Sequence, residues 1–410
     1  MKRVVVTGLG TISPVGNDVD TFWQNLIVGK HGVAEITKFD PSNMKVKIAA
    51  EVKNFSPEAY MEKSEIRKTD LYAQYALAAA TQAVEESGII GKIESSRFGV
   101  YIGSGIGGIS TFITETEKLL THGPRRVSPF FIPMMISNMA SALVAMKYNA
   151  QGPNLPIVSA CATSTHTIGE AFRAIKFGYA DAIITGGAEA TINPLAMAGF
   201  INCTALSTTN DPDNSSIPFD RRRNGFVMGE GAGVIVLEEY EHALKRNAVI
   251  YCEISGYGNT CDAYHITAPH PEAIGGAAVI RLAMEEAKVE VDEKLYINPH
   301  GTSTPLNDKA ETLAIKTAFG DIAYKMPISS TKSMVGHMLG AAGGVEAIVS
   351  IKAIQTGTIP PTIGYKEPDP DCDLDYVPNI SRQCDIDKAL SISLGFGGHN
   401  AGIVFKKLSV

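Results

Sequence analysis

The sequence predicts an α/β fold built from two similar halves. Three observations support this prediction. Short β-branched runs alternate with longer helical stretches, a strand followed by a Gly-x-Gly turn occurs near residue 6 and again near residue 254, and the elements after each copy follow in the same order. Of the 410 residues, 45% are hydrophobic and 19% are charged, which suffices for a large core. We expect one half over residues 1–250 and the other over residues 251–410.

The first half contains five predicted strands and four predicted helices. Short runs of β-branched and other apolar residues predict strands at 4–6, 98–102, 157–158, 182–184 and 234–237. Helical stretches are expected at 21–28, 65–87, 165–177 and 241–245. The third strand is expected to lead into the third helix, a strand-to-helix step that recurs in the second half.

The second half repeats this order. A helix at 274–287 precedes a strand at 295–298, as the helix 65–87 precedes the strand 98–102. The strand-turn-helix segment 328–354 corresponds to 157–177, and the closing strands are expected at 391–393 and 403–406. The first half is longer because of two inserted segments, at about 104–154 and 192–223. Long insertions in a compact domain usually form pocket walls or interfaces.

Composition excludes several classes of function. The chain has 36 Lys and Arg against 43 Asp and Glu, and the net charge of −7 argues against an extended nucleic-acid or membrane surface. The N-terminus lacks the apolar run of a secretory signal, and the most apolar long stretch, 130–148, is interrupted by a proline and three polar residues. The six cysteines form no Cys-x-x-Cys pair and are expected to be reduced thiols. We therefore expect a soluble, cytoplasmic protein.

Two apparent ligand motifs are incomplete. Residues 103–108 match G-x-G-x-x-G after a strand, but no acidic residue follows about twenty positions later, as a dinucleotide site requires. A close-packed turn is the better interpretation. Asp369, Asp371 and Asp373 alternate as in a calcium loop, but Leu374 and Ile380 occupy the sixth and twelfth positions. A solvated acidic loop is the better interpretation there.

A cysteine lies where a predicted strand gives way to a helix. The sequence Ser159-Ala160-Cys161 immediately precedes the helix expected at 165–177. Unpaired N–H groups and the dipole at a helix N-terminus favour a thiolate, so we expect a lowered pKa for Cys161. A lone cysteine in apolar surroundings more often serves only in packing. The reason to favour a catalytic role for Cys161 comes from motifs in the second half of the chain.

Two histidines follow predicted strands of the second half. His300 follows the strand at 295–298, and Lys332 and His337 follow the strand that begins at 328. Each histidine alone could equally be structural. Ligands gather at strand ends in open α/β folds, however, and three such ends carry Cys, His and His here. A final turn, Gly395-Phe396-Gly397-Gly398, could present a backbone N–H or could be a plain β-turn before the last strand.

These motifs together resemble the β-ketoacyl-[acyl-carrier-protein] synthases, and most closely the type II condensing enzymes of bacterial fatty acid synthesis. The resemblance rests on the segments 159–161, 300–305, 332–337 and 395–398, and it extends over the whole chain through 103–108, 123–126 and 225–231. Each motif alone is weak, and their common order makes the signal strong. The resemblance implies a duplicated thiolase-like fold with α-β-α-β-α layers, and a homodimer.

The resemblance also implies a mechanism. Cys161 would take the acyl chain from an acyl carrier protein as a thioester. Backbone N–H groups of Cys161 and Phe396 would form the oxyanion hole. His300 and His337 would hydrogen-bond the malonyl thioester while carbon dioxide leaves, and the resulting enolate would attack the acyl group. Neither a metal nor an organic cofactor is expected, because the substrates arrive on the phosphopantetheine arm of the carrier protein.

Further residues receive roles through the resemblance. Lys332 is expected to pair with Glu311 and to order the site, with Asp308 behind it. Binding of the phosphopantetheine arm is expected at Thr302 and Thr304. With the ring of Phe396, an acyl pocket is expected to be lined by Ile106, Phe131, Met197 and Phe200, although core packing is the ordinary role of such residues.

The acidic carrier protein should dock on a basic surface. Two basic clusters lie where the family meets its carrier protein, and they consist of Lys63, Arg67, Lys68, Arg125 and Arg126. A third cluster covers residues 221–223. The sequence departs from many relatives at Pro299, before the first histidine, and from some at His399, after the glycine turn. Neither departure removes a catalytic group.

Four other functions share parts of this pattern. A thiolase proper would use a second cysteine as its base, and His337 argues against it. The type III synthases use Cys-His-Asn, which also does not match. A polyketide ketosynthase carries the same three residues and stays open as an alternative. A non-catalytic chain-length partner subunit is the remaining one, although such proteins lose the nucleophile that Cys161 represents here.

Overall fold

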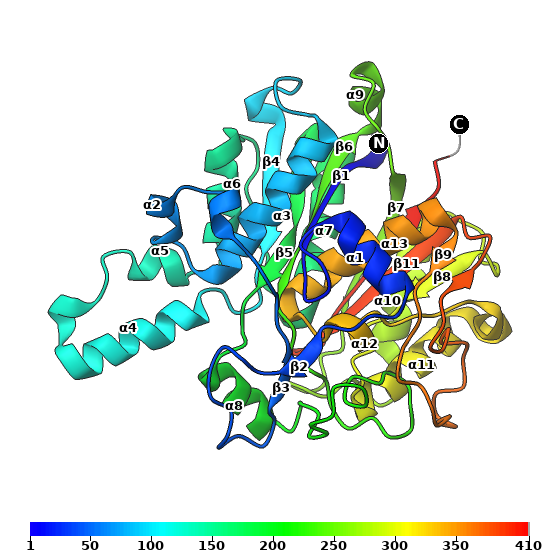
Figure 1. The fold of residues 1–410 in the computed structure, drawn as a ribbon. Coiled ribbons are helices and arrows are strands. Elements are labelled where there is room, and N and C mark those ends of the chain that lie inside the picture. Colours follow the sequence, from blue (N-terminus) through cyan, green and yellow to red (C-terminus); the bar gives the residue numbers. More distant parts are fainter. Residues whose placement is uncertain (409–410) are drawn as a thin grey trace.

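The fold is organised around one eight-stranded sheet, which the computed structural model describes within residues 1–408 (Figure 1). Its strand order is β4-β5-β6-β1-β7-β12-β11-β8. In that order the strands are Phe98–Gly103, Ala182–Glu189, Gly231–Glu239, Val4–Ile12, Cys252–Cys261, His399–Lys406, Lys388–Gly395 and Leu295–Asn298. Two small antiparallel sheets pair β2 with β3 and β9 with β10, with bounds Val33–Glu35, Ile48–Ala50, Thr358–Ile359 and Arg382–Gln383.

The sheet consists of two equivalent sets of four strands. In the first set β4 is parallel to β5, β5 is antiparallel to β6, and β6 is antiparallel to β1. In the second set β8 is parallel to β11, β11 is antiparallel to β12, and β12 is antiparallel to β7. The sets join through a short antiparallel pairing of β1 with β7. This repeat confirms the predicted α/β fold with two similar halves.

The helices complete the predicted α-β-α-β-α layers. They span Val19–Ile27, Lys63–Ile66, Leu71–Ser87, Ile109–His122, Phe131–Met135, Met139–Tyr148, Thr163–Lys176, Pro194–Asn202, Tyr240–Lys245, Ile274–Ala287, Pro305–Phe319, Lys332–Val335 and Ala342–Thr356, numbered α1 to α13. Helix α3 covers the outer face of the first strand set and α10 covers that of the second. Helices α7 and α13 pack against each other and against both sets, so they form the central layer.

The repeated Gly-x-Gly pairs have a different role from the predicted turn. Gly8 and Gly10 lie inside the continuous strand β1, and Gly256 and Gly258 lie inside β7. A Cβ on any of the four would come within 2.0–2.2 Å of a carbonyl oxygen of α3 or α10. The prediction of two turns was wrong, because the glycines are needed where a helix backbone crosses a strand closely.

Three predicted elements differ from those in the structure. The segment at 157–158 forms no strand, and Val158 is 53% exposed. The helix predicted at 65–87 is two helices, because the side chain of Asp70 accepts a hydrogen bond from the N–H of Tyr72 and caps a new helix there. Likewise Ile328 makes only an isolated bridge with Ile297.

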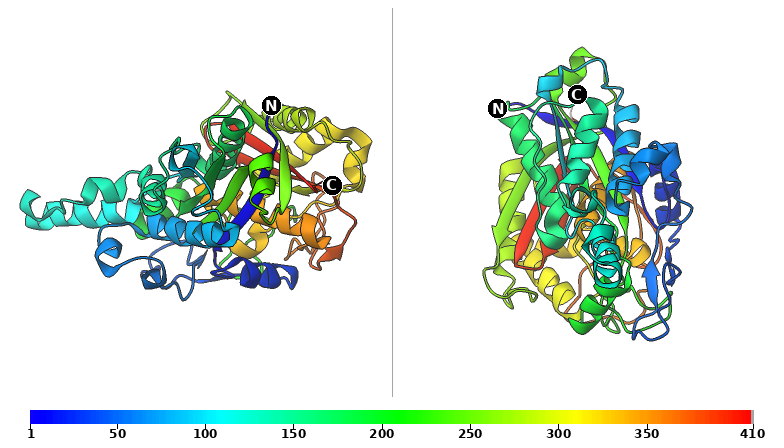
Figure 2. Two further views of the ribbon diagram at one scale, coloured as in Figure 1. Left: turned by 90° about the horizontal axis from the view of Figure 1, so that it is seen from above. Right: turned by 90° about the vertical axis from the view of Figure 1, so that its left-hand side faces the viewer.

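The first predicted insertion forms an arm. Helix α4 projects from the body and the chain returns through α5 and α6, as Figure 2 shows. The second insertion contributes α8 and a long loop. None of the helices within residues 1–408 is long and apolar enough to cross a bilayer.

Candidate active site

Three chemically active side chains from distant parts of the chain meet at one point. The sulfur of Cys161 and one ring nitrogen each of His300 and His337 all lie within 4.8 Å of one another. The two imidazoles meet edge to face, with ring centroids 5.2 Å apart. All three residues are buried. The structure therefore brings together the three residues that the sequence proposes as catalytic.

A tight turn presents the cysteine. Cys161 lies in the short 3-10 helix η4 (Ala160–Ala162), directly before α7. Ala160 has φ of +51°, in the left-handed region that costs a non-glycine residue about 1 kcal/mol. The N–H of Ser159 donates to Thr163 Oγ1 at 2.9 Å, and the N–H of Ala162 donates to the Ser159 carbonyl at 3.1 Å. These hydrogen bonds hold the turn closed.

The expected lowering of the cysteine pKa is wrong for this state of the protein. Burial raises the pKa of the Cys161 thiol to about 12. The charge of Lys332 and the N–H group of Phe396 act in the opposite direction but do not compensate for the loss of water. The resting side chain is therefore a neutral thiol, and its proton must leave during the reaction.

Backbone hydrogen bonds fix the loop that carries His300. The N–H groups of His300 and Gly301 donate to the two carboxylate oxygens of Glu311 on α11, at 2.5 and 2.7 Å. Burial, followed by the charge of Lys332, lowers the pKa of His300 well below 6.5, so the ring is neutral. Its Nδ1 has no hydrogen-bond partner among residues 1–408.

His337 is held through its backbone, and its ring stays free. Its N–H donates to the carbonyl of Val227 at 2.7 Å, and its ring packs edge to face on Phe226 at 5.0 Å. Burial, followed by the charge of Lys332, lowers the pKa of His337 well below 6.5. Neither ring nitrogen has a hydrogen-bond partner in the part of the chain that the structure describes. Both imidazoles thus retain polar atoms that a substrate could satisfy.

Lys332 has a different partner from the predicted one. Its ammonium pairs with Glu346 on α13 rather than with Glu311, and both members of the pair are buried. Glu311 is instead occupied by the two N–H groups of the His300 loop. The charge of Lys332 still acts to lower the pKa of Cys161, against the larger effect of burial. Asp308 lies behind the site, where it accepts hydrogen bonds from the N–H groups of Phe219 and Ser303.

The glycine turn between β11 and β12 contacts the cysteine. The N–H of Phe396 points at the Cys161 sulfur, where it favours the thiolate. A Cβ on Gly395 would lie 2.8 Å from the Ser159 carbonyl oxygen, so this position requires glycine. Gly397 donates its N–H to the carbonyl of Ile266 at 2.8 Å. The turn is thereby tied to the loop that follows β7.

The three reactive groups line a cavity of ≈ 400 Å³. Four further residues predicted for the substrate, Phe200, Thr302, Thr304 and Phe396, also line it. Three others do not. Met197 is fully buried in the apolar cluster that contains Cys161, Ile106 is 38% exposed, and Phe131 packs with Phe112 on the arm. Their place in an acyl pocket stays a prediction.

Several residues that shape the site were not found from the sequence. Phe226, Asn224 and Pro269 line the cavity, and only the first two fall near the segment 225–231 that the resemblance includes. Glu189 is fully buried and accepts hydrogen bonds from Ser104 Oγ and from three backbone N–H groups, those of residues 105, 106 and 340. The glycine-rich loop at 103–108 therefore wraps a carboxylate of the protein.

The predicted docking residues are exposed at two separate places. Lys63, Arg67 and Lys68 lie on and just after α2, and Lys68 stacks on the ring of Phe130 at 5.2 Å. Arg125 and Arg126 are exposed residues of η3 (Pro124–Arg126). This segment directly follows α4, which forms the projecting arm (Figure 2). The third cluster differs, because its last two arginines form ion pairs with Asp220 and Asp369.

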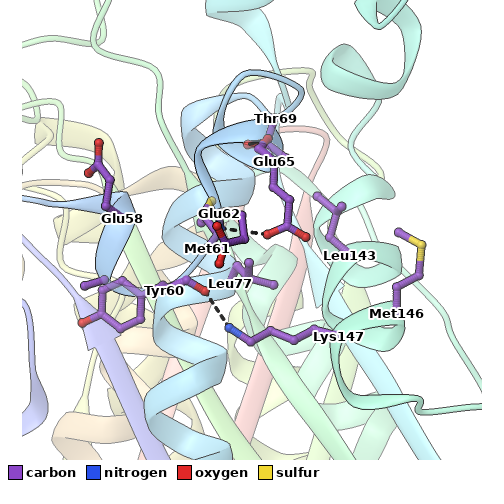
Figure 3. Close-up of a pocket in the computed structure, with 11 residues that line it drawn as sticks. Glu58, Tyr60, Met61, Glu62, Glu65, Thr69, Leu77, Leu143, Met146 and Lys147 are labelled. Atoms are coloured by element: carbon purple, nitrogen blue, oxygen red, sulfur yellow. Dashed lines mark hydrogen bonds between the residues drawn. The ribbon is translucent and has the colours of Figure 1, made fainter.

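A second cavity, of ≈ 520 Å³, lies between α2 and α6 and lacks these chemical groups (Figure 3). Lys147 crosses it and donates to the Tyr60 carbonyl at 2.7 Å and to Thr81 Oγ1 at 3.0 Å. Apart from Tyr60, the remaining lining consists of Thr69, three glutamates and apolar side chains. No cysteine or histidine lines it, so the smaller cavity is the candidate active site.

Within the described residues, Cys161, His300 and His337 also form the one cluster whose spacing could hold a metal ion. Two features disfavour that use. Metal-binding histidines usually donate their second nitrogen to a partner, and here Nδ1 of His300 and both nitrogens of His337 have none. The positive charge of Lys332 also acts on all three side chains. The cluster fits acyl transfer through a thiol better.

Comparison with known proteins identifies the family. The family model for the beta-ketoacyl synthase N-terminal domain matches residues 1–243, and that for the C-terminal domain matches residues 251–366. The 3-oxoacyl-[acyl-carrier-protein] synthase 2 of Staphylococcus aureus (strain COL) is 51% identical over 407 residues, covering 99% of this chain and 98% of the relative.

Solved structures agree with this assignment. A beta-ketoacyl synthase from Burkholderia phymatum STM815 superposes with a TM-score of 0.93 at 35% identity, over 100% of both chains. A ketosynthase of a type II polyketide system, solved in complex with its acyl-carrier protein, superposes with a TM-score of 0.90 at 34% identity, again over 100% of both chains. The chain belongs to the beta-ketoacyl synthase family.

Proposed function

We propose that this chain condenses an acyl-[acyl carrier protein] with malonyl-[acyl carrier protein] during fatty acid elongation. The products are 3-oxoacyl-[acyl carrier protein], carbon dioxide and free carrier protein. The observation that carries the proposal is the convergence of Cys161, His300 and His337 in one cavity. In this proposal residues 1–250 supply the nucleophile and residues 251–410 supply both imidazoles. Identity of 51% to relatives named for this reaction supports it.

The first step transfers the acyl chain to the cysteine. The Cys161 sulfur attacks the thioester carbonyl, a new S–C bond forms, and the bond to the phosphopantetheine sulfur breaks. The thiol proton leaves with the released phosphopantetheine thiol. Negative charge that develops on the carbonyl oxygen is stabilised by the N–H groups of Cys161 and Phe396. Removal of one such donor costs about 10²–10³ in rate in the best-studied enzyme.

The second step uses the two imidazoles. Neutral His300 and His337 donate hydrogen bonds to the malonyl thioester carbonyl, which stabilises the enolate formed when carbon dioxide leaves. The enolate carbon then attacks the acyl carbon, the C–S bond to Cys161 breaks, and the released thiolate takes up a proton from solvent. Thr302 and Thr304 line the same cavity as these groups, which supports a role in binding the phosphopantetheine arm. Decarboxylation generates the nucleophile, so the scheme uses neither a metal nor an organic cofactor.

Two kinds of partner follow from this proposal. Acyl carrier protein is the substrate carrier, and a second copy of the chain is the partner in a homodimer. Exposed apolar side chains on and near the first insertion support a dimer interface there, namely Phe112, Ile132, Met146, Leu155 and Val158. All six cysteines are free, which suits the reducing cytoplasm that we propose as its compartment.

Intact-protein mass spectrometry tests the proposal. After incubation with acyl-[acyl carrier protein], the wild type is expected to gain the mass of one acyl group, and Cys161→Ala is expected to gain none. Malonyl-[acyl carrier protein] should then discharge the adduct and yield 3-oxoacyl-[acyl carrier protein]. A missing adduct would favour the chain-length partner, and repeated extension without reduction would favour a polyketide ketosynthase.

Charge reversal tests the carrier-binding surface. The double variant Arg67→Glu with Lys68→Glu is expected to raise the KM for carrier-bound substrate about tenfold, because two attractive charges become repulsive. Activity with acyl-CoA should be unchanged, since it does not use this surface. The matched control, Lys92→Glu with Lys245→Glu, changes the same net charge at other exposed positions. Equal losses with both kinds of substrate would contradict the assignment.

A further inference from the structure

A short series of hydrogen bonds lies directly behind the catalytic turn and links buried Ser159 and His166 to the exposed Asn259. Nδ1 of His166, on the second turn of α7, lies 2.7 Å from Ser159 Oγ. On the other side of the ring, Nε2 lies 3.1 Å from Oδ1 of Asn259 on β7. The side chains of Ser159 and His166 are buried. Neither of the two reaction steps above uses these hydrogen bonds.

The partners determine where the protons are. The amide oxygen of Asn259 can only accept, so Nε2 of His166 carries the hydrogen. Nδ1 is then a lone-pair acceptor, and the Ser159 hydroxyl must donate to it. Burial lowers the pKa of His166, which keeps the ring in this neutral form. The Ser159 side chain is thereby fixed in one orientation.

Ser159 contacts both parts of the oxyanion hole. It precedes Cys161 by two residues and its carbonyl accepts the N–H of Ala162, within the same turn. The same carbonyl lies against Gly395, where an added Cβ would come within 2.8 Å of it. Gly395 precedes Phe396, the source of the second donor. A displacement of Ser159 would therefore change the separation of the two N–H donors.

We propose that His166 is a positioning residue for the oxyanion hole, which it holds in shape through Ser159. Asn259 anchors the imidazole on β7, and the imidazole anchors the turn that ends in the nucleophile. The left-handed Ala160 follows Ser159 directly, so the turn stores strain that an anchor must balance. This inference rests on the proposed function, because it assumes that an acyl thioester reacts at Cys161.

Two reactions of the same sulfur separate this role from simple packing. Transfer of an acyl group from a thioester passes through an oxyanion, whereas alkylation by iodoacetamide is a direct displacement and needs no oxyanion hole. In Ser159→Ala and His166→Leu we expect the acylation rate of Cys161 to fall about 10-fold to 100-fold. This fall should not exceed the one caused by removing a whole oxyanion-hole donor, about 10²–10³. The alkylation rate at Cys161 should stay within about twofold, with an unchanged melting temperature for Ser159→Ala.

Two controls accompany these variants. His166→Asn places an amide oxygen near the position of Nδ1, so it should accept from Ser159 and recover most of the acylation rate. Ser141→Ala removes a buried hydroxyl that donates to Val100 and is remote from the turn, and it should acylate like wild type. Peptide mapping must follow Cys161 alone, because Cys203 and Cys261 are exposed and will also be alkylated.

Each outcome decides the matter. Slow acylation with normal alkylation, recovered in His166→Asn, supports the positioning role. Wild-type acylation in Ser159→Ala overturns it, even if His166→Leu fails to fold. A parallel fall in both reactions also overturns it, because the sulfur itself has then been displaced. A wild-type protein that accepts no acyl group contradicts the proposed function instead.

Discussion

The two halves of the molecule contain the same backbone turn, but a different residue occupies its second position. Helix η4 precedes α7 in the first half, and η6 (Leu339–Ala341) precedes α13 in the second. Each turn begins with a residue in the left-handed region, Ala160 at φ +51° and Leu339 at φ +45°. The next residue is Cys161 in one turn and Gly340 in the other. The duplicated backbone is retained, but only one copy has a side chain at the reactive position.

The surroundings of Gly340 explain the missing side chain. Its N–H donates to Glu189 at 2.9 Å, and its carbonyl accepts from Ser164 on the first turn of α7. A Cβ there would come within 2.3 Å of the Gly105 nitrogen and 2.7 Å of the Glu189 carboxylate. Cys161 instead faces a cavity. The second turn therefore supports the first through its backbone, which shows how a duplicated element can become the scaffold of its counterpart.

The largest effect on stability is expected when Gly340 receives a side chain, and the comparison is with Cys161 losing its side chain. Gly340→Ala should lower the free energy of unfolding by about 3 kcal/mol, because its Cβ overlaps backbone that cannot move and breaks the hydrogen bond to Glu189. Cys161→Gly should change stability by about 1 kcal/mol, because it empties a site beside a cavity, yet abolish the acyl adduct. Urea unfolding and intact-protein mass spectrometry measure the two effects. Comparable stability of the two variants would contradict the division of roles.

The second effect concerns Glu189, the carboxylate that accepts a hydrogen bond from the N–H of Gly340 in η6. Glu189→Gln should cost about 1–3 kcal/mol, because one of its oxygens becomes an N–H donor facing backbone N–H groups. Burial raises the pKa of Glu189 from 4.5 to about 7. A raised pKa in the folded state means that ionisation favours the unfolded chain, so wild-type stability should decline as the pH rises from about 4.5 to 7.

Glu189→Gln lacks this titration, and its disadvantage relative to wild type should therefore shrink over the same range. Urea unfolding of both proteins at several pH values between 4 and 8 provides the measurement. A gap that widens with rising pH would mean that the hydrogen-bond donors keep Glu189 ionised in the folded protein. The pKa would then lie below 4.5.

The sequence predicted the reactive residues more reliably than the buried carboxylates that hold their surroundings in place. Cys161 and the histidines lie in short motifs next to strong strand and helix patterns, so local sequence located them. Glu189 and Glu346 belong to continuous buried segments, and their roles depend on partners that are 83 to 151 and 14 residues away. The expected pairing of Lys332 with Glu311 came from the resemblance, and the structure pairs Lys332 with Glu346 instead. Local spacing contains no record of such pairings.

Strand prediction failed for a related reason. A short apolar run predicts a strand, but strand formation requires a partner, and the segment at 157–158 has no partner strand among the described residues. The Gly-x-Gly pairs were interpreted as turns because glycine is typical of turns, whereas close helix packing demands it here. In both cases the deciding contact is tertiary. The order of helices and strands was predicted correctly because it follows from hydrophobic periodicity, which is a local property of the sequence.

The smallest effect concerns the strain that both turns share. Ala160→Gly removes a left-handed cost of about 1 kcal/mol but adds about 0.5–1 kcal/mol of chain entropy to the unfolded state, so stability should change by less than about 0.5 kcal/mol. The exposed Ala263, at φ +47°, provides the matched control for this balance. Acylation should nevertheless slow in Ala160→Gly alone, by about twofold to tenfold, because a glycine lets the turn sample other conformations. Equal acylation by Ala160→Gly, Ala263→Gly and wild type would show that hydrogen bonds alone hold the turn. Since Leu339 shares the same conformation without a nucleophile, the strain would then be a property inherited with the fold rather than one used in catalysis.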